Sequence, residues 1–217
     1  MKHDVARRNM VECQLRTNKL TAPRLIEAFE TVPRERFVPE AKRGVAYIDQ
    51  DLEVAPGRYL LDPMVLARLL QAAAIEPSDV VLDIGCATGY SAAILAQVAG
   101  TVVALESDPT LAEQANRTLG ELEIDNVVVV EGALRDGYPK QAPYGAVLLA
   151  GAVAELPEGI CAQLAEGGRL VTVLRDRPGL GQGTLFRCLD GQISKRSLFD
   201  AATPLLTEFV PKPSFVF

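Results

Sequence analysis

The stretch VLDIGCATGY at residues 81–90 determines the fold class that we predict for this chain. An apolar run ends in the acid Asp83, and a loop of small residues follows that contains Gly85 and Gly89. Glycine lets a backbone turn tightly and come close to a ligand. A buried strand that ends in such a loop is typical of nucleotide-type cofactor sites in parallel sheets.

Strand and helix patterns alternate on both sides of this stretch, which predicts βαβ units and a parallel sheet with helices on both faces. We expect strands at 79–85, 101–107, 126–132, 145–151 and 169–174, and helices at 1–31, 63–75, 90–100, 109–122 and 156–168. The segments 184–189 and 192–199 flank Asp190-Gly191, a hairpin turn signal. The fold class is therefore α/β, with three Rossmann-like layers and a mostly parallel sheet that ends in an antiparallel hairpin.

The length suits one domain, 1–217, in three parts. Residues 1–62 form an N-terminal helical extension and a substrate-side loop, in which 46–60 is a loop or a weakly extended segment. Residues 63–175 form the cofactor-binding core, and 176–217 form the C-terminal hairpin and tail.

Charge is distributed unevenly along the chain. Residues 1–43 carry ten Lys/Arg and six Asp/Glu, whereas the rest carries twelve against twenty-two, giving the net charge of −6. An acidic body argues against a nucleic-acid partner. The basic segment is interpreted as a solvated helical surface, with an anionic partner as the alternative. No apolar run is long enough to span a membrane and no signal peptide is evident, so we expect a cytoplasmic protein.

The cysteines and the single histidine exclude several kinds of site. Cys13, Cys86, Cys161 and Cys188 lie far apart with no CxxC pair, so neither structural disulfides nor a zinc site are expected. His3 is the only histidine, which argues against a Ser–His–Asp triad and a His-rich metal site.

Glu106 strengthens the cofactor interpretation of the loop at 83–89. It ends the second predicted strand, 23 residues after Asp83, and a carboxylate there can accept both hydrogen bonds of a ribose diol. A plain strand–helix turn is the alternative. A nicotinamide cofactor is less favoured because its G-x-G-x-x-G spacing is absent, and a P-loop is excluded because no Gly-Lys-Ser/Thr follows.

The spacing D-x-G-x-x-x-G with a later acid resembles the S-adenosylmethionine loop of the seven-stranded methyltransferases. Ala87 stands where that family usually has glycine. The conformational strain of an alanine at this position depends on the sign of its φ. Further segments, MVECQL at 10–15, VPRERFVP at 32–39 and AYIDQDL at 46–52, resemble the protein-L-isoaspartate O-methyltransferase family, and the likeness runs from about residue 8 to residue 174.

That resemblance implies a seven-stranded methyltransferase fold and methyl transfer from S-adenosylmethionine to isoaspartyl carboxylates of damaged proteins or peptides. It implies a cofactor site made by Asp83, Gly85, Cys86, Ala87, Gly89, Glu106, Ser107, Ala133 and Leu134. No metal is implied. The oligomeric state stays open between a monomer and a homodimer.

The chain departs from the family in the segment resembling G-Q-T-I-S-Q-P, which here is residues 57–63. The family's active-site serine falls on Leu61, and Asp62 replaces a glutamine. Tyr59 and Asp62 are the candidate catalytic residues. For Asp62 the favoured interpretation is instead a helix N-cap. For Tyr59 a surface position has the same weight as a catalytic role. Leu60 and Leu61 are interpreted as core residues. Arg58 is expected to be solvated, with pairing to an anionic substrate as the alternative.

Two other family residues and one family motif are changed outside this segment. Ala133 replaces an aspartate that faces the adenine, Gly145 replaces the aspartate that opens the fourth strand, and a Phe-Val-Pro-Leu motif is reduced to residues 202–205. Two alternatives to the repair methyltransferase therefore stay open: an enzyme of the same fold with a small-molecule acceptor, and a non-catalytic binding or regulatory protein.

Overall fold

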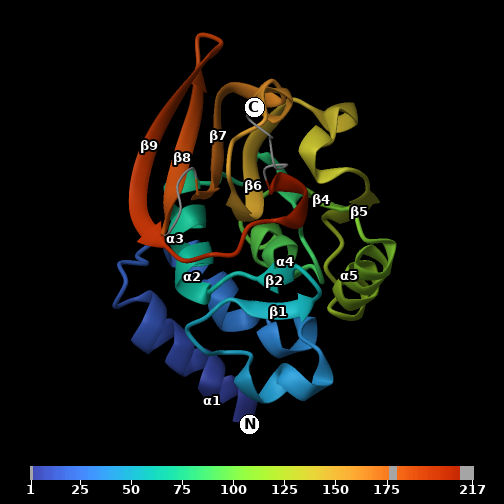
Figure 1. Ribbon diagram of the computed structural model, residues 1–217. Helices are drawn as coiled ribbons and strands as arrows, with labels where there is room; N and C mark the ends of the chain where they lie inside the picture. The colour runs from blue at the N-terminus through green and yellow to red at the C-terminus, as the bar shows by residue number, and fades with distance from the viewer. Residues whose placement is uncertain (1, 176–179, 211–217) are drawn as a thin grey trace, which may run out of the picture.

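The computed structural model describes residues 2–175 and 180–210, and its main feature is a seven-stranded sheet in the order β5-β4-β3-β6-β7-β8-β9 (Figure 1). The strands are β3 (Val80–Ile84), β4 (Thr101–Glu106), β5 (Val127–Glu131), β6 (Tyr144–Val153), β7 (Leu164–Leu174), β8 (Gly181–Leu189) and β9 (Gln192–Ala201). The helices are α1 (Lys2–Asn9), α2 (Pro23–Thr31), α3 (Pro63–Ala73), α4 (Tyr90–Ala96), α5 (Pro109–Glu121) and α6 (Glu158–Cys161). A separate hairpin pairs β1 (Leu52–Ala55) with β2 (Arg58–Leu60).

The strands β5, β4, β3, β6 and β7 pair in parallel, and β8 and β9 add the antiparallel end of the sheet. The predicted fold class is confirmed, including the hairpin turn, in which Asp190 and Gly191 both have positive φ. The strand order reverses at β3, which lies between β4 and β6. Ligands of such sheets bind beyond the carboxyl ends of the strands at this reversal, and the loop after β3 lies there.

Apolar residues on both sides of each central strand build two cores. Val81 belongs to a core shared with α3 and α4, whereas its neighbour Leu82 belongs to a second core on the other face. Successive side chains of a strand point to opposite faces, so a strand buried on both sides reads as a continuous apolar run. The second face is covered by α6 and by short 3₁₀ turns that include Leu134–Asp136 and Thr207–Phe209.

The N-terminal extension is not the continuous helix predicted for 1–31. After α1 the chain continues as a π-helical segment, Met10–Leu15, and then breaks before α2. Lys19 has φ +69° within this break, and Pro23 occupies the first position of α2. Proline fits the first turn of a helix because its missing N–H has no intrahelical partner there.

The helix predicted at 156–168 is also wrong beyond Cys161, because the chain enters β7 at Leu164. The backbone N–H of Tyr144 donates to the carbonyl of Gln163 (2.8 Å), so this segment is joined to the neighbouring strand. Gly159 and the pair Gly167-Gly168 lower helix propensity in the same segment. The segment 46–60 is confirmed as partly extended, since it contains the β1–β2 hairpin.

Arg169 fastens the amino-terminal edge of the sheet to the end of α3. Its guanidinium pairs with Asp79 (2.7 Å) and donates to the carbonyls of Ala73, Ala74 and Gly145. A Cβ atom on Gly145 would lie 2.2 Å from Asp79 Oδ1. Glycine at this position therefore makes room for the ion pair, and an aspartate there would clash with it.

We predict that Arg169→Met lowers the free energy of unfolding by about 3–5 kcal/mol, because it leaves Asp79 without its cation in a mostly buried position. The control Arg36→Met removes an exposed pair with Glu121 and should cost about 1 kcal/mol or less. Denaturant unfolding of both variants measures the difference. Equal losses in the two variants would contradict the structural role assigned to Arg169.

Candidate functional site

The carboxyl ends of β3, β4 and β6 meet at one edge of the sheet, which we call the cofactor edge. The loop 85–89 follows β3, and Glu106 ends β4. The β1–β2 hairpin lies over this edge, and in Figure 1 the red segment after β9 runs back across the molecule to end beside β6. That segment forms an isolated bridge between Leu205 and Ala152 of β6. Parts of the chain that are distant in sequence therefore meet at the cofactor edge.

The loop 85–89 has the backbone conformation that its glycines suggest. Gly85 has φ +78° and Gly89 has φ +94°. Ala87 has φ +48°, so the residue at the unusual position adopts the left-handed conformation that disfavours a Cβ atom. Its backbone N–H donates to Glu106 Oε2 (2.9 Å), which ties the loop to the end of β4.

Asp83 lies at the end of β3 with its carboxylate removed from water. Its Oδ2 accepts from the Ser91 hydroxyl (2.6 Å), whereas its Oδ1 has no hydrogen-bond partner among the described residues. Burial, followed by repulsion from the Glu106 carboxylate, raises the pKa of Asp83 to about 7. An unpartnered buried carboxylate oxygen beside a cofactor loop suits a cationic ligand group.

Glu106 is fully buried, and its carboxylate is saturated with donors from the chain itself. Oε1 accepts from the backbone N–H groups of Ser107 (2.8 Å) and Asp108 (3.1 Å) and from Arg58 Nε (3.1 Å). Oε2 accepts from the N–H of Ala87. The carboxylate assigned to a ribose diol is therefore already occupied, and a cation holds it.

The expectation that Arg58 is solvated is wrong, because the residue is 5% exposed and pairs inside the protein. Besides Glu106, its guanidinium contacts the Ser107 hydroxyl (2.8 Å), the Thr207 hydroxyl (2.9 Å) and the Glu208 carboxylate (2.5 Å). Burial alone would lower the pKa of Arg58, but the two facing carboxylates raise it. Arg58 thus joins three distant parts of the chain, β2, the end of β4 and residues 207–208.

Leu206 fills the space beside the cofactor loop. A Cβ atom on Gly85 would lie 3.2 Å from Leu206 Cδ2, and one on Gly151 would lie 2.6 Å from Leu206 Cγ. Leu134 belongs to the second core, is fully buried and also faces Gly85. The cavity left between the loop and the β1–β2 hairpin is about 10 Å³.

The described residues therefore fit S-adenosylmethionine only in part. Asp83 and the loop 85–89 suit the ligand, but Glu106 is paired with Arg58. Ligand pockets typically enclose roughly 300–1,000 Å³, far more than the cavity beside Gly85. In this arrangement of the chain the space beside Gly85 is closed, whereas an open hollow of about 520 Å³ is lined by residues that include Arg58, Ser107 and Thr207. No reaction step follows from this arrangement.

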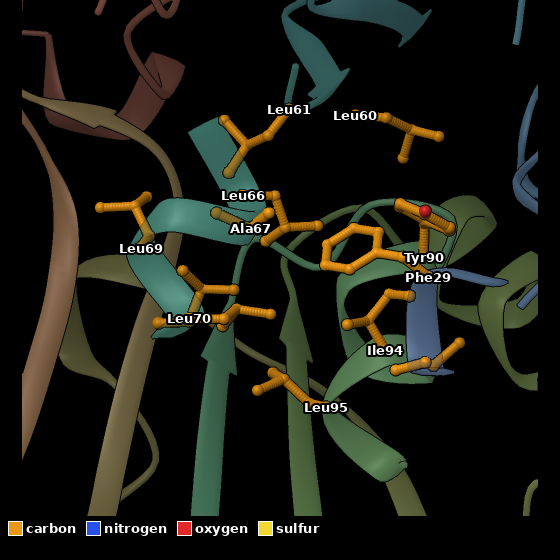
Figure 2. Packing of buried hydrophobic residues seen from close by; sticks show 14 of the residues in the cluster. Phe29, Leu60, Leu61, Leu66, Ala67, Leu69, Leu70, Tyr90, Ile94 and Leu95 are labelled. Atoms are coloured by element: carbon orange, nitrogen blue, oxygen red, sulfur yellow. The ribbon is translucent and has the colours of Figure 1, made fainter. Parts of the chain in front are cut away.

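The segment that holds the candidate catalytic residues serves mainly structural roles. Leu60 and Leu61 belong to the first core, and Figure 2 shows Leu61 directed toward Leu66 and Ala67 of α3. The Leu61 carbonyl accepts a hydrogen bond from Arg34, which is fully buried. Core packing at these two leucines agrees with the interpretation favoured from the sequence.

Asp62 caps α3, as predicted, by accepting from the N–H of Met64 (2.8 Å). Burial, followed by the nearby carboxylates of Asp49 and Asp51, raises the pKa of Asp62 to about 6. The Tyr59 hydroxyl donates to Glu53 on the paired strand (3.4 Å). Neither side chain is directed into a cavity large enough for an acceptor.

The other predicted cofactor residues are divided between the edge and its surroundings. Cys86 is buried in the loop, and Ser107 contacts both Arg58 and Glu208. Ala133 is exposed at the start of a 3₁₀ turn. The sequence analysis did not identify Leu206 and Glu208 as residues of this edge. No local sequence signal identified them, because Arg58 was expected to be solvated and Glu208 lies 150 positions from it.

Comparison with known proteins shows one protein family that matches most of the chain. The family model described as protein-L-isoaspartate(D-aspartate) O-methyltransferase matches residues 6–183. Protein-L-isoaspartate O-methyltransferase 2 of Anaeromyxobacter sp. (strain Fw109-5) is 40% identical over 168 residues, which cover 77% of this chain and 69% of the relative. The protein-L-isoaspartate O-methyltransferase of Protochlamydia amoebophila is 41% identical, with coverages of 75% and 77%.

Solved structures agree with this grouping. A protein-L-isoaspartate O-methyltransferase superposes with a TM-score of 0.80 at 25% identity, covering 92% of this chain and 65% of that one. A putative protein-L-isoaspartate O-methyltransferase of Plasmodium falciparum, in complex with S-adenosyl-L-homocysteine, gives a TM-score of 0.75 at 18% identity, with coverages of 95% and 98%. At 18% identity the second likeness supports the fold alone.

We predict that Ala87→Gly raises the free energy of unfolding by up to about 1 kcal/mol, because glycine relieves the left-handed strain but loses more entropy on folding. Ala72→Gly, at a right-handed position of α3, should instead cost about 1 kcal/mol. Denaturant unfolding of both variants checks the opposite signs. A loss at position 87 equal to that at position 72 would contradict strain in the loop.

We predict that Asp83 makes the protein less stable as the pH rises from about 4 to about 7. Its folded pKa lies above the unfolded value, so the folded state binds the proton more tightly and loses that advantage as the group ionises. Each unit of pKa shift corresponds to about 1.4 kcal/mol. Urea unfolding across this range should show a steeper fall in the wild type than in Asp83→Asn, because Asp62, whose pKa is also raised, contributes to the fall in both. Exposed Asp125→Asn is the control. Parallel curves for the wild type and Asp83→Asn would contradict the assignment.

Proposed function

The chain belongs to the protein-L-isoaspartate(D-aspartate) O-methyltransferase family, and from this premise we propose that it transfers a methyl group from S-adenosylmethionine to isoaspartyl carboxylates of proteins or peptides. The observation that carries the proposal is the family match over residues 6–183, with relatives about 40% identical over most of the chain. The cofactor loop and the acid at the end of β4 support it from the structure.

Methyl transfer to a carboxylate needs little from the protein's side chains beyond positioning. A carboxylate is ionised at neutral pH, so the acceptor needs no general base. Correct alignment of the reacting groups supplies most of the rate. The absence of a hydroxyl at Leu61 therefore removes one hydrogen bond to the acceptor rather than a group that carries the reaction.

A second candidate is a non-catalytic member of the family that keeps the fold. The observation that favours it is the pairing of Arg58 with Glu106, which closes the cofactor edge. Loss of the acceptor-side hydroxyl at Leu61 agrees with it. This candidate and the methyltransferase differ in whether the edge ever admits a cofactor.

The proposed setting is the cytoplasm, with a damaged protein or peptide as partner and no nucleic acid. The four cysteines of the chain are free thiols, which suits a reducing compartment. No helix within residues 2–175 and 180–210 combines the length and apolar character that crossing a membrane requires. A monomer and a homodimer are both compatible with the proposal.

The proposed activity predicts labelled methyl transfer from S-adenosylmethionine to an isoaspartyl peptide and none to the matching aspartyl peptide. The two peptides have the same composition, so the difference reports recognition of the isomerised linkage. Glu106→Ala should reduce the transfer at least tenfold because it removes the carboxylate assigned to the ribose. Absence of transfer to either peptide, from protein shown to be folded, would favour the non-catalytic candidate.

A further inference from the structure

Arg58 and residues 204–209, which we call the C-terminal plug, occupy the position at the sheet edge that the cofactor loop faces. We propose that the plug and Arg58 compete with S-adenosylmethionine for the cofactor edge, so that the cofactor binds only when they are released together. The identity of the competing ligand rests on the proposed function. The closure itself rests on the contacts described below.

The first argument is the engagement of Glu106. A ribose diol bound there would donate two hydrogen bonds to the carboxylate. In the structure Oε1 already accepts from Arg58 and from two backbone N–H groups. The guanidinium of Arg58 is held in turn by Thr207 and Glu208 of the plug. A ligand at Glu106 therefore has to displace a cation that two carboxylates hold.

The second argument is the space beside Gly85. A glycine with positive φ leaves its backbone open to a close neighbour, and Leu206 of the plug is that neighbour. Leu206 packs on Gly151 in the same way, so its side chain lies between the loop after β3 and the end of β6. Phe209 of the plug is 1% exposed and belongs to the second core. Leu206 therefore fills the space next to the Gly85 backbone.

The third argument is that, apart from its polar contacts with Arg58 and Ser107, the plug makes few hydrogen bonds to the rest of the chain. Its backbone makes two hydrogen bonds to β6, from Ala152 N–H to Pro204 (2.9 Å) and from Leu206 N–H to the Ala152 carbonyl (2.9 Å). The side chain of Arg135 adds a bond to the Glu208 carbonyl (3.2 Å). The plug contains only a 3₁₀ turn, Thr207–Phe209. It can leave the edge without unfolding any strand of the main sheet.

Charge balance couples the release of Arg58 to that of Glu208. A ribose diol is neutral, so replacing Arg58 alone would leave Glu106 and Glu208 facing each other in a buried site. Unpaired buried charges cost several kcal/mol. Glu208 is 29% exposed in its side chain and lies on the plug, so it can move into water when the plug moves. The coupling makes the plug and Arg58 one unit that opens as a whole.

The experiment measures binding of S-adenosylhomocysteine by calorimetry to the wild type and to two opening variants. Arg58→Gln removes the cation from Glu106, and Leu206→Ala removes the side chain that covers Gly85. Each should tighten binding at least tenfold, because apparent affinity rises with the fraction of molecules that have an open edge. Two variants are used so that a folding defect in one leaves the other informative.

Matched controls separate opening from general destabilisation. Arg36→Gln makes the same substitution at an exposed pair with Glu121. Leu164→Ala removes a leucine of the second core near the start of β6, away from the cofactor edge. Neither control should change the affinity for S-adenosylhomocysteine by more than about twofold, which is below 0.5 kcal/mol at about 1.4 kcal/mol per tenfold change.

Hydrogen exchange of residues 203–209 gives a readout that does not depend on activity. Saturating S-adenosylhomocysteine should accelerate exchange of the Leu206 amide, because the bound ligand displaces the plug from β6. Unchanged protection of this amide in the bound protein would overturn the proposal. Equal affinity of the wild type, Arg58→Gln and Leu206→Ala would overturn it as well, and so would a failure of all three to bind.

The same variants distinguish this inference from the proposed function. If the opening variants bind S-adenosylhomocysteine more tightly but methylate neither peptide, the competition stands and the isoaspartyl activity does not. If the wild type methylates the isoaspartyl peptide with the plug amides still protected, the activity stands and the competition does not.

Discussion

A carboxylate that has no access to water must receive hydrogen bonds or a cation from its surroundings, and Glu106 imposes this requirement on the whole cofactor edge. Three backbone N–H groups, from Ala87, Ser107 and Asp108, satisfy part of it. Arg58 supplies the cation. The conformation of the loop after β3, the position of β2 and the course of the chain after β9 are all linked to this one carboxylate.

The strain at Ala87 is understandable in the same terms. The residue holds φ +48° although its Cβ disfavours that conformation. The left-handed backbone directs its N–H to Glu106 Oε2. A different conformation would withdraw a donor from a buried carboxylate, and that loss exceeds the strain of one alanine. The change from the family's glycine is thus compatible with the loop geometry, and the question it raises is one of stability rather than of loop shape.

The sequence was sufficient for features that depend on neighbouring residues. Apolar runs predicted the parallel strands because the central strands β3, β4 and β6 are buried on both faces. Asp190-Gly191 predicted the β8–β9 turn, and Asp62 followed by proline predicted the start of α3, since both signals act over two or three residues. The helix predicted at 156–168 was wrong because local pattern favoured a helix where pairing with Tyr144 takes the chain into β7. The break after Leu15 was missed because no proline or glycine marks it before Pro23.

The closed state of the site could not be predicted, because its contacts join residues that local patterns never compare. Arg58 reaches Glu106 across 48 positions and Glu208 across 150. Each residue has an ordinary interpretation by itself: a solvated arginine, a ribose acid and a tail residue.

Together the three residues carry one positive and two negative charges at a buried edge, and a neutral diol cannot replace the positive one without expelling a negative one. The fate of Glu208 therefore determines whether the edge can open. Since Glu208 lies on a segment held to β6 by two backbone hydrogen bonds, the charge that must leave is placed outside the strands of the main sheet.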